Sequence, residues 1–215
     1  MRVLSTLVLL ACVAHALAAQ QPAAPNDSTD HPIWVSVSAG LLRGTPISDR
    51  ASNAGWHLHT SAPVTVAFSM PLWGKTLGLR AQTAGINMRF TGPPCIDCAA
   101  RVQSTATLLT MNTTSQIGNS AYNTEIEYAI GMVSWTGLRG RNGDQVPTSG
   151  AAHDFAYGLS LGWSRLMNDR VDALLMIDVL SLTHAIGKAE ITGVHGSGQV
   201  LLYGMRAGAR MQLGR

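Results

Sequence analysis

The chain has 215 residues, enough for one domain, and its formal net charge is only +3. Charged residues make up 13% of it, about half of the roughly 25% typical of soluble domains, while apolar residues reach 46%. This composition excludes the Lys- and Glu-rich surface that keeps soluble proteins dispersed. The sequence also has no basic patch of the kind that indicates nucleic-acid binding.

After the N-terminus, no apolar run is long enough for a transmembrane helix. Low charge without such a helix leaves one structure that is compatible with a membrane. It is a closed β-barrel, in which every backbone polar group is paired between strands.

The first 18 residues have the three parts of a secretory signal peptide. Met1-Arg2 supply positive charge, an apolar stretch follows, and Ala16-Leu17-Ala18 fits a small-x-small cleavage site. We therefore expect residues 1–18 to be a signal peptide and residues 19–32 to form a flexible periplasmic leader, since the latter are rich in Ala, Pro, Asn and Asp. The alternatives are a buried N-terminal helix and a lipid anchor on Cys12, which ends a lipobox-like Leu-Leu-Ala-Cys run.

Beyond the leader, apolar and polar residues alternate with period two, which predicts β-strands. In the clearest segment Phe155, Leu159 and Trp163 share one face, and Gly158 and Ser160 lie on the other. The predicted strands are 33–43, 56–70, 76–90, one within 101–113, 122–133, 155–165, 171–183 and 200–213.

The third of these segments changes phase along its length. Its apolar set begins with Leu77 and Leu79 and continues with Ile86 and Met88. We predict a bulge near Ala84-Gly85 that brings both sets onto the same face.

The predicted connections alternate in length. Those after the second, fourth and sixth strands are short, whereas 44–54, 91–100, 134–154 and 184–199 are long. Short turns at one end and long loops at the other are typical of outer-membrane barrels. An even number of strands places both termini at the short-turn end, which is periplasmic in such barrels.

Alternation also fits a soluble barrel whose apolar face points inward. Here, however, the face opposite the apolar one carries mostly Gly, Ser, Ala and Thr, which suit the crowded interior of an eight-stranded barrel. Trp56, Tyr122, Trp163 and Tyr203 stand near the ends of the apolar faces, where aromatic girdles form at the headgroup level. The sequence thus predicts an all-β fold, an eight-stranded antiparallel up-and-down transmembrane β-barrel at 33–215.

Two segments resemble a known family. The stretch from Tyr157 to Met176 resembles the strand–turn–strand unit of small OmpA-like and OmpX-like barrels. The end of the chain, Arg206-x-Gly208-x-x-Met211-x-Leu213, resembles the C-terminal signal read by the barrel-assembly machinery, with Met and Leu in place of the usual aromatic residues. The resemblance implies an eight-stranded barrel in the bacterial outer membrane, inserted by that machinery.

Several charged residues fall on the predicted inner face. They are Arg80, Glu125, Glu127, Arg206 and Arg210, with Asp172 and Asp178 able to join them. Because burying an unpaired charge costs several kcal/mol, we expect a structural cluster of ion pairs. The alternative is a narrow gated ion path, for which eight strands leave little water space.

Two other groups could form sites. His57 and His59, two residues apart on the polar, inner face of the predicted second strand, suit a metal, but no third ligand lies nearby, so no metal site is expected. Cys95 and Cys98 form a CxxC in a predicted outer loop, for which a local disulfide is expected in an oxidising compartment.

An enzymatic interpretation finds little support. Lipid A deacylases, which are barrels of similar size, carry a His-x-Ser element and a downstream Glu. His184 and Glu190 stand in the corresponding region, but position 186 is Ile, and no Glu follows Ser197. We expect neither catalysis nor a cofactor.

The sequence therefore predicts a structural or interacting outer-membrane barrel, serving membrane integrity, adhesion or surface contact. Its expected partners are outer-membrane lipid and lipopolysaccharide, the latter through the basic 134–154 loop with Arg139 and Arg141, and a monomer is expected. The alternatives are a passive channel or carrier for small hydrophobic molecules, which needs an apolar lumen, and a soluble periplasmic ligand-binding barrel.

Overall fold

The computed structural model describes residues 32–49, 54–91, 98–118, 121–140, 152–184 and 198–213. The predicted signal peptide, all of the predicted leader but its last residue, and Cys12 and Cys95 lie outside these ranges. The described residues form the strands β1 (Ile33–Gly44), β2 (Ile47–Asp49), β3 (Ala54–Leu58), β4 (Val64–Leu72), β5 (Lys75–Thr91), β6 (Cys98–Gln116), β7 (Tyr122–Gly140), β8 (Ala152–Asn168), β9 (Val171–His184) and β10 (Gly198–Leu213). Within them, no helix has the length and apolar character needed to cross a membrane.

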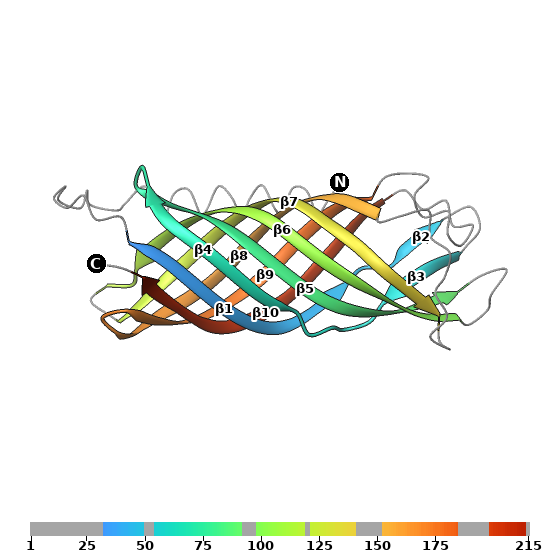
Figure 1. Cartoon of the computed structure of the whole chain (residues 1–215), viewed down its shortest axis with the longest axis horizontal. Coiled ribbons are helices and arrows are strands. Elements are labelled where there is room, and N and C mark those ends of the chain that lie inside the picture. Colours follow the sequence, from blue (N-terminus) through green and yellow to red (C-terminus); the bar gives the residue numbers. More distant parts are fainter. Residues whose placement is uncertain are drawn as a thin grey trace.

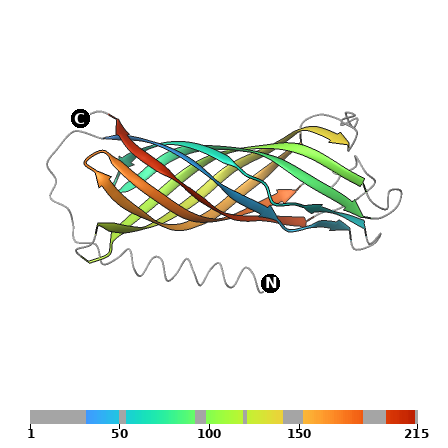
Figure 2. The same cartoon turned by 90° about the horizontal axis from the view of Figure 1, so that it is seen from below.

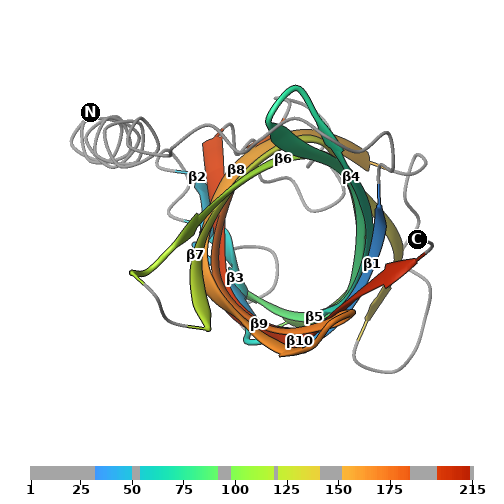
Figure 3. The same ribbon diagram turned by 90° about the vertical axis from the view of Figure 1, so that its left-hand side faces the viewer.

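Eight of these strands close into a ring (Figures 1 and 3). Each is antiparallel to its neighbours in chain order, from β4 to β10, and β1 closes the ring by pairing with both β4 and β10. The predicted eight-stranded antiparallel up-and-down barrel is confirmed. β1 begins and β10 ends at one end of the barrel, which we call the terminal end, and the opposite end is the distal end (Figure 2).

The predicted strand 56–70 is interrupted. β3 and β4 both pair with β5, but the five residues 59–63 between them lie opposite only four, 84–87. The extra residue makes this a bulge, and it includes Pro63, which has no backbone N–H to donate to a ladder. The bulge predicted at Ala84-Gly85 is therefore wrong, because β5 pairs with β6 in unbroken register from Thr76 to Phe90.

The phase change read in the third segment has a different cause. Arg80, Ala84 and Ile86 are all buried, so one set of alternate residues faces the lumen along the whole of β5. Ile86 and Met88 pack in the interior rather than on the outer wall. The strand keeps its phase, and the lumen itself changes from charged to apolar along its length.

Several strands are longer than predicted. β6, β7 and β8 extend toward the distal end, so 134–140 and 152–154 of the predicted 134–154 loop are strand, and 141–151 lies outside the described residues. Near its end β7 carries a bulge, since residues 137 and 138 lie opposite Val102 alone, and Gly137 has φ 63°. The bulge puts Arg139 opposite Arg101 on the outer wall.

The turn between β4 and β5 is a tight two-residue hairpin. Trp73 and Gly74 have φ of 49° and 71°, the left-handed values that type I′ turns require. A tryptophan pays a steric cost at such a position, and this one is 90% exposed, so protein contacts contribute little to holding it there.

Replacing Trp73 with asparagine is expected to stabilise the barrel in detergent by up to about 1 kcal/mol, because Asn-Gly is the favoured type I′ pair. The urea unfolding midpoint measures this. A lower midpoint for the variant would show that the indole contributes more than the backbone conformation costs.

Candidate functional site: the lumen

The lumen has two layers of different chemistry. In the layer nearer the terminal end, the structure gathers every charged residue that the sequence placed on the inner face. These are Arg80 on β5, Glu125 and Glu127 on β7, Asp172 and Asp178 on β9, and Arg206 and Arg210 on β10. All but Arg210 are less than a tenth exposed, and each stands on its strand's inward alternation.

Glu127 and Asp178 share two arginines. The guanidinium of Arg206 donates to Glu127 Oε1 at 2.9 Å from Nη2, and to Asp178 at 3.0 and 3.2 Å from Nε. Arg80 Nη1 donates to Glu127 Oε1 and lies 3.5 Å from Asp178 Oδ1. Ser160 Oγ donates to Asp178 Oδ1 at 2.5 Å. This group of four charges, the inner group, is neutral and joins four strands across the lumen.

A second group lies nearer the terminal end. Arg210 donates to Asp172 Oδ2 from Nη2 at 2.6 Å and from Nε at 3.1 Å, and to Glu125 Oε2 from Nη1 at 3.2 Å. Its Nη2 also lies 2.8 Å from Glu125 Oε1, a close ion-pair contact without hydrogen-bond alignment. The ring of Trp34 stands 5.1 Å from Arg210 Cζ. This outer group has two carboxylates and one arginine, so its net charge is −1.

The two groups should therefore respond differently to loss of a carboxylate. Glu125→Gln leaves Arg210 paired with Asp172 and keeps an amide oxygen that can accept from Arg210, so it is expected to change the free energy of unfolding by no more than about 1 kcal/mol. Glu127→Gln leaves two buried arginines with one carboxylate and should cost about 2 kcal/mol or more. Urea titration of both variants tests this. Equal losses would contradict the assigned charge balance.

The distal layer of the lumen is apolar. It contains Leu42, Leu58, Ala84, Ile86, Val102, Ala106, Leu108, Ala129, Val133, Ala156, Leu180, Leu182, Val200 and Leu202, with Met88 and Trp135 packed against them. Leu108 and Leu182 are fully buried, as core residues of a soluble domain are. The Trp135 indole donates to the buried Asp154 at 2.6 Å. The expectation that the lumen is charged therefore holds for one layer only.

The outer wall of the barrel is covered by apolar side chains. Large apolar side chains are about half exposed there, among them Val37, Leu41, Phe68, Leu79, Leu109, Ile130, Ile177 and Met205. Tyr122, Trp163 and Tyr203 are on this wall as predicted. Trp56 is not, because β3 lies beyond the 59–63 bulge and presents Trp56 and Leu58 inward.

The other candidate groups do not form a site in the described residues. His57 and His59 are exposed on the outer wall rather than on the inner face, and among the described residues no group of three or more His, Cys, Asp or Glu is arranged to hold a metal ion. Cys98 begins β6, while Cys95, Glu190 and Ser197 fall outside the described part of the chain.

One Ser–His contact was missed by the sequence analysis. Ser134 Oγ lies 2.9 Å from His153 Nδ1 on the exposed outer wall. The two residues are 19 apart in sequence and meet through the β7–β8 register, so no local sequence motif predicts the contact. In the described residues no carboxylate contacts this His153 ring to complete a triad.

Comparison with known proteins shows the fold alone. No family model matches the chain, and no curated protein matches it. Among solved structures, the chain is similar to the crystal structure of Neisserial surface protein A (NspA), with 9% sequence identity and a TM-score of 0.56. The match covers 84% of this chain and 97% of NspA. The fold is that of a small outer-membrane-type barrel.

Proposed function

We propose that this protein is an outer-membrane barrel that conducts nothing through its lumen and acts as a structural component or through its distal, surface-facing segments. The observation that carries the proposal is the combination of an apolar outer wall with a lumen closed by packed side chains. The family would be the small OmpA-like or OmpX-like barrels, with both termini periplasmic after signal-dependent export.

The outer wall supports the membrane location. Half-exposed apolar side chains surround the barrel, including Val37 on β1, Leu109 on β6 and Ile177 on β9. Monomeric soluble proteins rarely expose a continuous apolar belt. A soluble ligand-binding barrel, with its apolar side chains inward only, fits this wall poorly.

The lumen supports a role other than transport. Arg80, Glu127 and Arg206 span it and are each at most 5% exposed, so little water reaches them. The apolar layer, toward the distal end, is buried to the same degree, since Leu108 and Leu182 are 0% exposed. A carrier of hydrophobic molecules would have an apolar chamber at the distal end, but that chamber is filled by its own side chains.

Interaction partners belong to the same proposal. Arg101 and Arg139 face each other on the distal outer wall, where phosphates of lipopolysaccharide would lie. Insertion would use the barrel-assembly machinery, through a C-terminal strand whose outer face ends in Met211 and Leu213. We propose a monomer because the ring leaves no ring strand unpaired on either side.

The test begins with the mature chain refolded in detergent and run on a gel with and without boiling. A change in mobility on boiling is expected for a detergent-resistant closed barrel. The same protein in liposomes should give no flux of glucose or of small ions above that of empty vesicles. A chain that stays in solution without detergent would overturn the membrane location, and measurable flux would overturn the closed lumen.

A further inference from the structure

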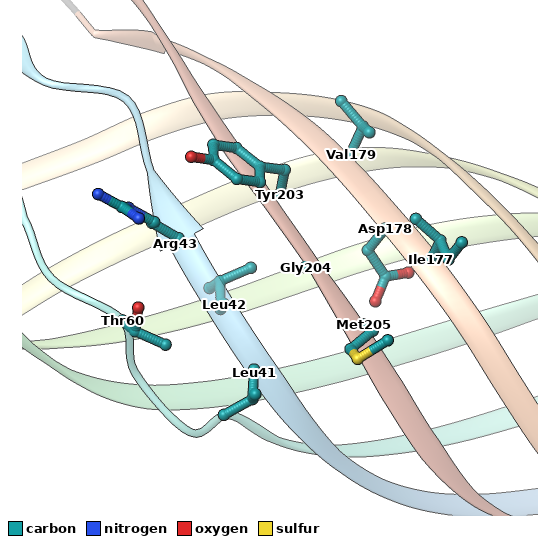
Figure 4. A pocket seen from close by; sticks show the side chains of 10 residues that line it. All are labelled: Leu41, Leu42, Arg43, Thr60, Ile177, Asp178, Val179, Tyr203, Gly204 and Met205. Atoms are coloured by element: carbon teal, nitrogen blue, oxygen red, sulfur yellow. The ribbon is translucent and has the colours of Figure 1, made fainter.

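The outer wall is hollowed where β1, β10 and β9 run side by side, at the distal end of β1 and the middle of β9. A groove of about 360 Å³ lies there (Figure 4). Its outward side chains are Leu41 and Arg43 of β1, Tyr203 and Met205 of β10, and Ile177 and Val179 of β9. The groove lies at the seam that joins the first and last strands of the ring.

The break between β3 and β4 shapes the wall beside the groove. Regular pairing of β1 with β4 stops at Ala39 and Val64, and beyond it the wall continues through the Gly40 N–H bond to Pro63 O and the Leu42–Ser61 bridge. Thr60, inside the 59–63 bulge, borders the groove. A wall of regular paired strands would present a more even surface than this.

The groove is lined almost entirely by apolar atoms, and its polar end is marked by the side chains at its rim. Leu41 pairs with Met205, which pairs with Ile177, and these side chains are about half exposed. Two residues further along, Arg43 is directly opposite Tyr203, and Figure 4 shows the guanidinium and the phenol beside each other.

Charge distinguishes the polar end. Asp178 also lines the groove, but its carboxylate faces the lumen and is bound by Arg206 and Ser160. On the distal outer wall, the fixed charges of the described side chains are all arginines: Arg43, Arg89, Arg101 and Arg139. Arg43 therefore supplies a positive charge beside the groove.

We propose that this groove binds one phosphate-bearing membrane lipid, with an acyl chain along Leu41, Met205 and Ile177 and the phosphate at Arg43 and Tyr203. A guanidinium forms charge-assisted hydrogen bonds to phosphate oxygens, and a tyrosine hydroxyl suits the boundary between acyl chains and headgroups. The inference rests on the proposed function, because a lipid reaches this wall only if the barrel lies in a membrane.

The chain offers a matched control for Arg43. Arg165 is directly opposite Tyr122 on the outer wall, but at the terminal end, where its Cζ lies 5.3 Å from the centre of the Tyr122 ring. It is the same residue pair outside the lining of this groove. Arg165→Gln removes an equal charge from an equally exposed wall.

Native mass spectrometry of the refolded barrel, released from detergent at increasing concentrations of phosphatidylglycerol, measures binding of the first lipid. Arg43→Gln should weaken that binding about tenfold, and Tyr203→Phe should weaken it less, whereas Arg165→Gln should leave it unchanged. Met205→Gln should also weaken it, because the acyl chain loses an apolar partner. Equal binding by wild type and Arg43→Gln overturns the site.

Inorganic phosphate provides the second arm. A lipid site requires that phosphate at millimolar concentration fail to displace phosphatidylglycerol, since it lacks the acyl chain. Displacement at equal affinity would replace the lipid with a free anion as occupant. The boiling-dependent gel shift is run on every variant, so that failure of the barrel to be a membrane protein is separated from failure of the groove to bind lipid.

Discussion

Replacing Arg206 with leucine is expected to lower the free energy of unfolding by about 3–5 kcal/mol. The substitution leaves Glu127 and Asp178 with Arg80 as their one remaining arginine in the inner group, and both acidic residues are buried. A buried charge without its partner is among the most costly defects a folded protein can carry. Urea-induced unfolding in phospholipid vesicles, followed by tryptophan fluorescence, measures the loss.

Two further variants separate charge from volume. Arg206→Leu combined with Asp178→Leu keeps Arg80 and Glu127 as a one-to-one pair and should recover most of the loss, because balanced apolar replacement of buried pairs is often close to neutral. Arg165→Leu, an exposed arginine on the outer wall, should change stability by less than about 1 kcal/mol. If the double variant were as unstable as Arg206→Leu, packing rather than charge balance would hold the layer together.

Leu108→Ala is expected to cost about 2–5 kcal/mol, the usual range for a buried leucine in a packed core. Its neighbour Leu109→Ala should cost less than about 1 kcal/mol, because Leu109 is 57% exposed on the outer wall whereas Leu108 is 0% exposed in the lumen. The same unfolding titration compares them. A reversed order would mean that the apolar layer inside the barrel is not a core.

The alternation of apolar and polar residues predicted the fold, because each side chain of a barrel strand points either into the lumen or out from the wall. The 155–165 and 171–183 segments, with bulky residues such as Leu161 and Ile177 on one face, correspond closely to β8 and β9. The inward charges followed from the same rule, since Glu125, Glu127, Arg206 and Arg210 stand among small or polar neighbours on one alternation.

The distal layer was not predicted, because the sequence pattern equated apolar with outward. That rule fails where a strand continues past the apolar part of the outer wall toward the distal end. There Asn87 and Arg89 are exposed and Ile86 is buried, so the pattern is that of a soluble protein. The same reversal misplaced Trp56, His57 and His59. The 59–63 bulge and the Gly137 bulge carry no signal strong enough to fix their positions from sequence.

The pairing of β1 with β10 determines when the barrel can close. Ile33 pairs with Leu213, so the ladder that closes the ring joins the two ends of the described chain. Such non-local pairing gives a high contact order, which slows folding because the chain entropy is lost before the last contacts form. Until the final strand pairs with β1, both edges of the forming sheet are open and able to pair with other chains. Closure therefore has to follow translation, and a chain truncated before Gly198 would lose the strand on which closure depends.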